Sequence, residues 1–186
     1  MAITYKSLPK AEKKLIKSMY WRSFTLYSAV TPAKQGASGV SYTMQPFIDR
    51  FYKNREADRK AAMVRHMSYF NTNVAMFPFI MGITASMEKE NAEKDDFNPE
   101  SINAIKTSLI GPLAGIGDSV FWGVLRVIAA GIGVSLAQAN NFMAPLIFLL
   151  LFNLPVQLVR WQGAKLGYTL GASYISDLYE SGMINV

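Results

Sequence analysis

The sequence predicts an all-α, polytopic membrane protein with an amphipathic N-terminal helix and glycine-rich segments that are broken or re-enter the membrane. The first reason is composition, because 51% of the residues are hydrophobic and only 17% are charged. An ordinary soluble domain has about 25% charged residues. The second reason is that basic blocks flank the apolar segments, as they do in cytoplasmic loops. The third is the uncharged segment 142–159, which is close to the length of a membrane span.

The first expected element is a basic amphipathic helix within residues 1–27. Ser7 can cap this helix, and Pro9 suits its first turn. On a helical wheel one group of apolar side chains falls within about 100°: Leu8, Leu15, Ile16, Met19 and Leu26. Because lysines form another face, the helix can lie in the lipid headgroup layer. The alternative is that the apolar side packs in a protein core and the lysine side is solvated.

Residues 28–186 are expected to form a membrane transport domain. Residues 28–46 mix Gly, Ser, Pro and Thr without a clean period, which predicts a loop or a broken helix. A second basic helix is expected to begin near Asn54, a suitable N-cap. The apolar run 74–87 is short for a span and is interrupted by a proline and a glycine, so it predicts a re-entrant or half-membrane segment.

The C-terminal half is expected to hold a loop followed by membrane segments. The acidic stretch 88–100 predicts a hydrophilic loop, with Pro99 starting the next helix. The segment 142–159 is the best transmembrane candidate, although polar side chains and a proline predict a kink in its second half. A group of residues after it resembles an interfacial anchor: Arg160, Trp161 and Lys165.

Several function classes are excluded by residue content. The chain has no cysteine, which excludes disulfides, thiolate metal sites and a cysteine nucleophile. His66 is the single histidine, so a multi-histidine metal site is excluded. The basic groups are not spread along one face with interleaved aromatics, as nucleic-acid binding requires. We therefore expect no catalytic residue, metal, cofactor or nucleic-acid partner.

The segment 106–133, KTSLIGPLAGIGDSVFWGVLRVIAAGIG, holds six of the thirteen glycines. It does not match a dinucleotide fingerprint, which needs a third glycine, or a P-loop, which needs G-K-S/T. An intramembrane aspartyl protease also carries Gly-x-Gly-Asp, but its chemistry needs a second carboxylate. The remaining aspartates lie in charged or terminal stretches. Discontinuous membrane backbone that packs against protein or lines a cavity is the best interpretation.

Asp118 and Ser119 are expected at the N-terminus of the helix that continues through Trp122. There a carboxylate can cap free N–H groups and is favoured by the helix dipole. An ionisable group in a membrane segment is also a candidate for substrate binding. Arg126 follows eight residues later, near the same helix face, and is a candidate ion-pair partner. Capping, ion pairing and substrate contact all stay open from the sequence.

The stretch KTSLIGPLAGIGDSVFWGVLR resembles the signature of the IID membrane subunits of the mannose/fructose/sorbose family of the bacterial phosphotransferase system. RHMSYFNTNVAMFPFIMGITASME (65–88) is similar to a second block of that family, and YWRSF near residue 20 and GVSYTMQPFIDRFY (39–52) also fit. The resemblance covers most of the chain. Chains of that family continue past Asn185-Val186 with more apolar sequence, so the resemblance implies a transport domain that is incomplete at its C-terminus.

This resemblance implies a function that composition does not show. A IID subunit pairs with a IIC subunit in the bacterial inner membrane, and together they bind and translocate a hexose. Cytoplasmic IIB, phosphorylated by IIA, then phosphorylates the sugar, and IID carries no phosphohistidine. The +5 charge of residues 1–22 predicts a cytoplasmic N-terminus. The alternative function is a non-transporting membrane scaffold or receptor whose glycine-rich hairpin packs helices.

Three further side chains are candidates for contact with sugar or with a partner. Asn71 and Thr72 stand before an apolar run, where they either cap a helix or offer an amide and a hydroxyl to sugar hydroxyls. His66 either contacts sugar or docked IIB, or is interfacial or structural. Trp122 is the best sugar-stacking candidate among the tryptophans because it lies close to Asp118, although tryptophans also form interfacial belts.

Overall fold

The computed structural model describes the backbone of residues 4–180 and the side chains of residues 4–172. All helices and turns of this part follow in the order α1 (Lys10–Arg22), α2 (Ala37–Phe51), α3 (Glu56–Arg65), α4 (Phe77–Glu93), α5 (Glu100–Gly117), a π-helical segment (Asp118–Leu125), α6 (Arg126–Gln138) and α7 (Ala144–Glu180), with short 3₁₀ turns at Tyr5–Ser7 and Ser23–Thr25. The predicted all-α class is confirmed.

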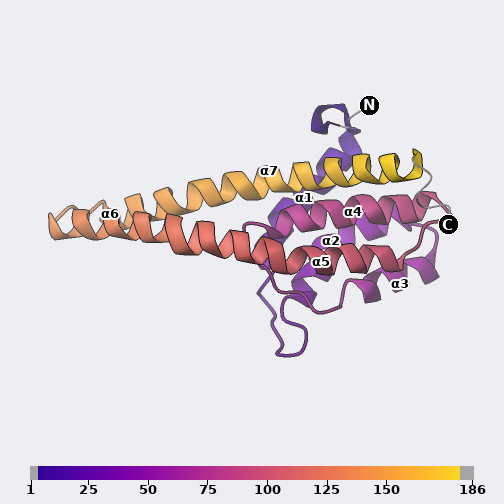
Figure 1. Ribbon diagram of the computed structural model, residues 1–186, viewed down its shortest axis with the longest axis horizontal. Coiled ribbons are helices and arrows are strands. Elements are labelled where there is room, and N and C mark those ends of the chain that lie inside the picture. The colour runs from indigo at the N-terminus through magenta and orange to yellow at the C-terminus, as the bar shows by residue number, and fades with distance from the viewer. Residues whose placement is uncertain (1–3, 181–186) are drawn as a thin grey trace.

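A long helical hairpin extends from a compact helical body (Figure 1). Its first arm is one continuous helix, Glu100–Gln138, made of α5, the π-helical segment and α6. Its second arm is the N-terminal part of α7. Both arms are long and apolar enough to cross a bilayer. At the tip, Asn140 has a left-handed φ of 53°, and the N–H of Asn141 bonds the carbonyl of Leu136 at 3.0 Å. This Schellman-type ending reverses the chain between the arms.

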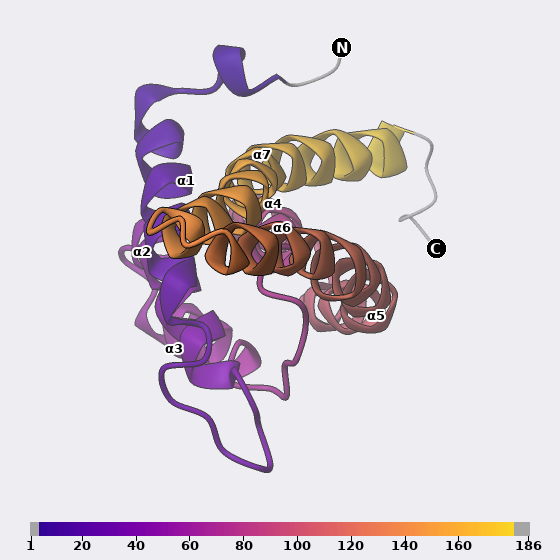
Figure 2. The same cartoon turned by 90° about the vertical axis from the view of Figure 1, so that its left-hand side faces the viewer.

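The body is built around α4, which packs along the C-terminal part of α7 (Figure 1). Gly82 of α4 meets the α7 backbone so closely that an added Cβ would lie 2.5 Å from the amide nitrogen of Tyr168. On α7, glycines recur every four residues, at Gly163, Gly167 and Gly171, and face α4. Small residues at this spacing let two helix backbones approach closely. Figure 2 shows α1, α2 and α3 on the other side of the body.

The apolar face predicted for the first helix is used inside the protein. Ile16 and Met19 are fully buried, and Leu26 and Leu8 are almost so, because α1 packs against α2 and α7. The core-packing alternative therefore describes this face. Aromatic side chains stay at the surface beside it, with Trp21 62% exposed and Phe24 48% exposed.

Three expected local structures differ in extent from those in the protein. Residues 37–46 lie in α2, which tolerates Pro46, so only the first part of the stretch 28–46 is non-helical. Within the apolar run 74–87, α4 begins at Phe77, and most side chains up to Met87 are buried inside the body. The stretch 88–100 is a loop only after Glu93, because α4 continues through its first six residues. In each case the local sequence pattern was compatible with more than one structure, and long-range packing determined which one formed.

The expected break before Asp118 was also wrong. Asp118 has helical dihedrals, φ −67° and ψ −43°, and the chain stays helical on both sides of it. The irregularity is a change of hydrogen-bond register to π-helix, which often marks functional positions inside α-helices. Asp118 is therefore inside a helix and does not cap one.

Candidate functional site

A cavity of about 240 Å³ lies where the hairpin leaves the body. It is bounded by the π-helical segment, the end of α5 and the loop that leads into α4. Four predicted site residues meet there: Asp118, Asn71, Thr72 and Trp122. The remaining lining side chains are Tyr27, Asn73, Val74 and Ala114. Segments far apart in sequence thus build one polar pocket at the root of the hairpin.

Asn73 orients the carboxylate of Asp118. Its Nδ2 donates to Asp118 Oδ1 at 2.8 Å, and its own Oδ1 accepts from the backbone N–H of Ala75 at 2.9 Å. Gly117 makes this approach possible, since a Cβ there would lie 2.5 Å from the Asn73 Cβ. Both ends of the amide are therefore fixed, and the glycine before Asp118 serves close packing and not a turn.

Tyr27 lines the pocket and contacts the Asn71–Thr72 segment. Its hydroxyl lies 2.7 Å from both the Asn71 Oδ1 and the Thr72 carbonyl oxygen, and accepts from the Thr72 N–H at 3.1 Å. Burial raises the pKa of Tyr27, and the charge of Asp118 adds to this. Tyr27 is therefore a neutral hydroxyl at physiological pH that holds the Asn71–Thr72 backbone in place.

The other predicted residues of the hairpin have different surroundings. The Arg126 guanidinium lies 5.1 Å from the centre of the Trp122 ring, so it stacks on the tryptophan. Within residues 4–172, Arg126 forms no ion pair with Asp118. Ser119 donates to the Gly115 carbonyl of its own helix at 2.8 Å and is outside the pocket lining. Two turns of one helix place Asp118 and Arg126 beyond direct contact, so an ionic partner of Arg126 would have to come from another segment or subunit.

His66 lies apart from this pocket, in a buried ionic cluster around Glu88. Its Nε2 is 2.8 Å from Glu88 Oε1, and both side chains are fully buried. Arg65 Nε donates to the same oxygen at 3.0 Å, and the Tyr52 hydroxyl donates to Oε2 at 2.7 Å. His66 is thus an internal hydrogen-bond partner. Of the two alternatives open for His66, the buried position favours the structural role over contact with sugar or with a docked subunit.

The pKa shifts in this cluster follow from burial and from these partners. Burial by itself raises the pKa of Glu88, but the hydrogen bonds and charges of His66 and Arg65 outweigh burial and lower the pKa to about 2. Burial lowers the pKa of His66, against the opposing effect of Glu88. We therefore describe a neutral imidazole whose Nε2–H donates to an ionised carboxylate. The sequence missed this cluster because Glu88 was assigned to an exposed acidic loop.

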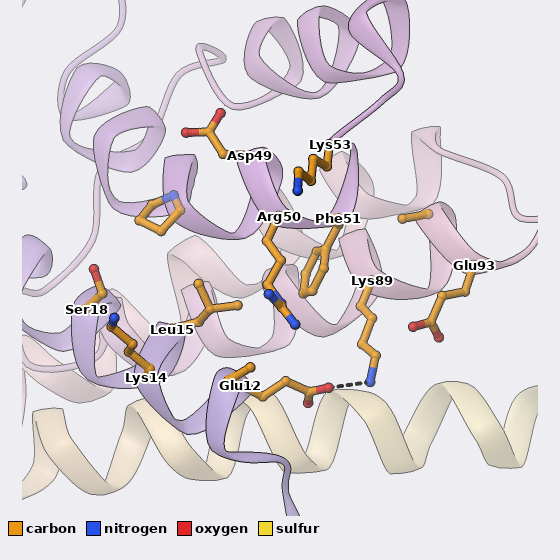
Figure 3. A pocket seen from close by; sticks show the side chains of 13 residues that line it. Glu12, Lys14, Leu15, Ser18, Asp49, Arg50, Phe51, Lys53, Lys89 and Glu93 are labelled. Carbon is orange, nitrogen blue, oxygen red and sulfur yellow. Dashed lines mark hydrogen bonds and ion pairs between the residues drawn. The ribbon is translucent and has the colours of Figure 1, made fainter.

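A second and larger cavity, about 850 Å³, opens between α1, α2 and α4 (Figure 3). Lys89 donates to Glu12 at 2.8 Å across it, and Arg50 points from α2 toward this pair (Figure 3). The second oxygen of Glu12 accepts from Tyr168 at 2.9 Å. This cavity is therefore a charged surface groove between three helices, in which Glu12 is already engaged by Lys89 and Tyr168.

Comparison with known proteins fits this architecture. The family model for the mannose/fructose/sorbose IID component of the phosphotransferase system matches residues 10–186. The chain belongs to this family. The mannose-specific EIID component of Escherichia coli K12 is 34% identical over 171 residues, which cover 90% of this chain and 60% of that protein. The sorbose-specific EIID component of Klebsiella pneumoniae is 38% identical over 161 residues, covering 87% and 58%.

A solved structure supports the same relationship. A chain of the complex of mannose transporter ManYZ with microcin E492 superimposes with a TM-score of 0.86 at 32% identity, covering 92% of this chain and 62% of that one. This IID-family chain therefore spans about 60% of the length of the relatives it matches. It is a bacterial membrane component of a phosphotransferase system, and its two long apolar helices are consistent with a place in the membrane.

Proposed function

We propose that this chain binds and translocates a hexose together with a IIC partner, and that cytoplasmic IIB, phosphorylated by IIA, then phosphorylates the sugar. The observation that carries this proposal is the pocket around Asp118. One oxygen of Asp118 is held by Asn73, and the second has no hydrogen-bond partner among the described residues. Sugar hydroxyls donate and accept, so they suit a carboxylate set beside fixed amides and hydroxyls.

The ring of Trp122 gives this pocket an apolar wall. The side chain is 41% exposed and lines the cavity beside Asp118. A flat aromatic surface next to a carboxylate matches the two faces of a hexose, which has C–H groups on the ring and hydroxyls at its edge. Arg126 lies over the same tryptophan and restrains its orientation. We propose that Trp122 orients the sugar and Asp118 binds its hydroxyls.

The IIC partner is proposed to cover the exposed hairpin. Gly111, Gly115 and Gly131 have open space where a Cβ would stand, so a neighbouring helix can approach their backbone closely. Asp118 is itself exposed in the isolated chain, although it stands in a membrane-length helix. A carboxylate is costly in contact with lipid, which favours burial against a protein partner. Co-expression with IIC should yield a single complex, whereas expression alone should give an unstable protein.

Replacing Asp118 with asparagine tests the proposed site. Asn keeps the size but removes the charge and exchanges one acceptor for a donor. We expect a loss of about 1–3 kcal/mol at the site, which is roughly a 5- to 150-fold decrease in sugar uptake and phosphorylation. The amount of assembled complex is measured in the same membranes. Normal transport at normal complex levels would remove Asp118 from the proposed site.

Two further variants separate the possible roles. Arg126→Gln should reduce uptake mainly through the orientation of Trp122, because Arg126 does not pair with Asp118. Ser119→Ala is the matched control, since its hydroxyl bonds its own helix and does not line the pocket. If the chain is instead a non-transporting scaffold, all three variants will leave uptake unchanged when complex levels are equal.

The proposed orientation places the N-terminus in the cytoplasm of a multi-pass protein. Residues 1–22 carry a local charge of +5, and such blocks remain on the cytoplasmic side. We propose that residues 1–27 lie at that membrane surface, with their lysine face toward the headgroups. A cysteine placed at Lys6 should react with a membrane-impermeant label only in opened cells. Labelling from outside intact cells would reverse the assignment.

A further inference from the structure

Beside the second arm of the hairpin, α1 and α7 enclose an apolar groove of about 350 Å³. Its floor and walls are mostly aromatic and aliphatic: Tyr20, Trp21, Leu154, Gln157, Leu158 and Trp161, with Lys17 at the edge. The Tyr20 hydroxyl donates to Gln157 at 3.2 Å and joins the two helices across the groove. The groove is therefore a fixed feature between α1 and α7, distinct from the Asp118 pocket.

One end of this groove continues into the membrane-facing surface of α7. Leu154 and Leu158 are one helical turn apart and are 58% and 64% exposed. They belong to the segment Ala144–Ala172, which is long and apolar enough to cross a bilayer. An exposed leucine stripe on such a helix contacts acyl chains. This end of the groove is thus shaped for a lipid tail.

Positive charge gathers at the other end. Lys165 Nζ lies 4.3 Å from the centre of the Trp161 ring and 5.1 Å from that of Tyr5, and Lys13 Nζ lies 5.9 Å from the same Tyr5 ring. Lys17, one turn after Lys13, lines the groove itself. Within residues 4–172 none of the three lysines forms an ion pair with a carboxylate.

Glu12 is the acidic residue of α1, and it is already engaged by Lys89 and Tyr168 on another side of the helix. Lys13 and Lys165 share the Tyr5 ring, and Lys17 lines the groove one turn from Lys13, so an anion placed among these like charges relieves their repulsion. Tryptophans beside them mark the level of the lipid headgroups. The basic rim of the groove therefore suits a negatively charged headgroup, and its apolar floor suits an acyl chain.

We propose that this groove binds an anionic phospholipid, with its phosphate among Lys13, Lys17 and Lys165 and one acyl chain along Leu158 and Leu154. The lipid would fill the space between α1 and α7 and join the body to the bilayer. Basic pockets beside transmembrane helices bind acidic headgroups in this manner. The inference does not depend on sugar transport, because its readout is lipid binding by the intact complex.

The test uses the complex isolated from its own membrane in mild detergent and native mass spectrometry of bound lipid. Phosphatidylglycerol and phosphatidylcholine with identical acyl chains are titrated separately. The wild type should bind phosphatidylglycerol more tightly, and Lys17→Gln/Lys165→Gln should weaken that binding about 25-fold, at roughly fivefold per lysine. Lys14→Gln/Lys53→Gln is the charge-matched control, since these lysines line the cavity on the other side of α1, and should change binding less than twofold.

Three results would overturn the proposal. Equal affinity for the two lipids, or an unchanged affinity in Lys17→Gln/Lys165→Gln, would show that the ammonium groups do not hold a headgroup. Displacement of the lipid by equimolar glycerol phosphate would identify a site for free anions. Absence of bound lipid, with Lys17 crosslinked to another subunit, would identify the groove as a protein interface. Thermal unfolding of each variant confirms that the compared complexes are folded.

Discussion

Two carboxylates in this molecule, Glu88 and Asp118, have opposite surroundings. Glu88 is fully buried in the body and bonds His66, Arg65 and Tyr52. Asp118 is exposed at the root of the hairpin and bonds the amide of Asn73, beside an open cavity. A carboxylate whose acceptor capacity is filled by the protein stabilises the fold. One that keeps free capacity in a cavity can bind a ligand. Whether the protein itself fills the hydrogen-bond acceptors of a carboxylate therefore distinguishes the structural Glu88 from the candidate ligand-binding Asp118.

The largest expected effect is that of Glu88→Ala, which tests the structural role of the buried carboxylate. Removing the carboxylate leaves the Arg65 guanidinium and the buried His66 imidazole without their acceptor, which typically costs about 3–5 kcal/mol. We expect a large fall in the thermal unfolding temperature of the purified complex and a low yield in membranes. Asp118→Ala, measured in parallel, should unfold close to the wild type. Similar unfolding temperatures for Glu88→Ala and the wild type would contradict a structural role.

The same cluster predicts acid sensitivity. The pKa of Glu88 is about 2 in the folded protein and near its ordinary value of 4.5 in the unfolded chain. Its contribution, on the order of 3 kcal/mol, is therefore complete above pH 4.5 and is lost as the pH falls toward 2. The pKa of His66 is lowered by burial, so the unfolded chain gains a proton first and stability already declines below about pH 6.5.

Chemical denaturation of the complex at pH 7, 5 and 4 measures this dependence. Glu88→Gln cannot titrate, so its free energy of unfolding should start lower and change less between pH 5 and 4 than that of the wild type. Parallel curves for the two proteins over this interval would rule out Glu88 as the source of the acid sensitivity.

The Asp118 pocket can be disturbed without touching its polar groups. Gly117→Ala places a methyl group where the Asn73 side chain stands, 2.5 Å from its Cβ, and overpacking of this kind costs about 1–3 kcal/mol. We expect Asn73 to shift from Asp118, with lower uptake and a slightly lower unfolding temperature. Gly123→Ala, in the same π-helical segment, is the matched control, because its added Cβ meets only the Asp118 carbonyl oxygen at an ordinary 3.7 Å. A loss in Gly123→Ala equal to that in Gly117→Ala would contradict the role of the Gly117–Asn73 contact in the pocket.

The smallest expected effect is that of Tyr27→Phe. The change removes a hydroxyl that bonds the Asn71–Thr72 segment and keeps the ring, so it should cost about 0.5–1.5 kcal/mol. Sugar KM should rise roughly 2- to 13-fold at unchanged complex levels. Tyr42→Phe is a control on an exposed tyrosine outside the pocket. An unchanged KM for Tyr27→Phe would mean that this side of the cavity does not contact sugar.

Much of the candidate site could be predicted from the sequence because its signals are local. A carboxylate inside an apolar, glycine-rich segment is conspicuous, and Asn71, Thr72 and Trp122 stand out for their chemistry. Asn73 and Tyr27 were missed because their importance lies in contacts across long sequence separations, 45 residues between Asn73 and Asp118 and 44 between Tyr27 and Asn71. No periodicity or motif encodes such a contact.

The sequence by itself determined the helical class, the membrane-length segment 142–159 and the family, because hydropathy, charge blocks and a specific motif are properties of neighbouring residues. The tertiary structure determined which apolar segments are buried inside the body. The run 74–87 became a core helix because glycines spaced by four on α7 admit α4 at close range. Tertiary structure also decided that Glu88 is enclosed while Asp118 is open, since burial depends on what the rest of the chain brings to each residue.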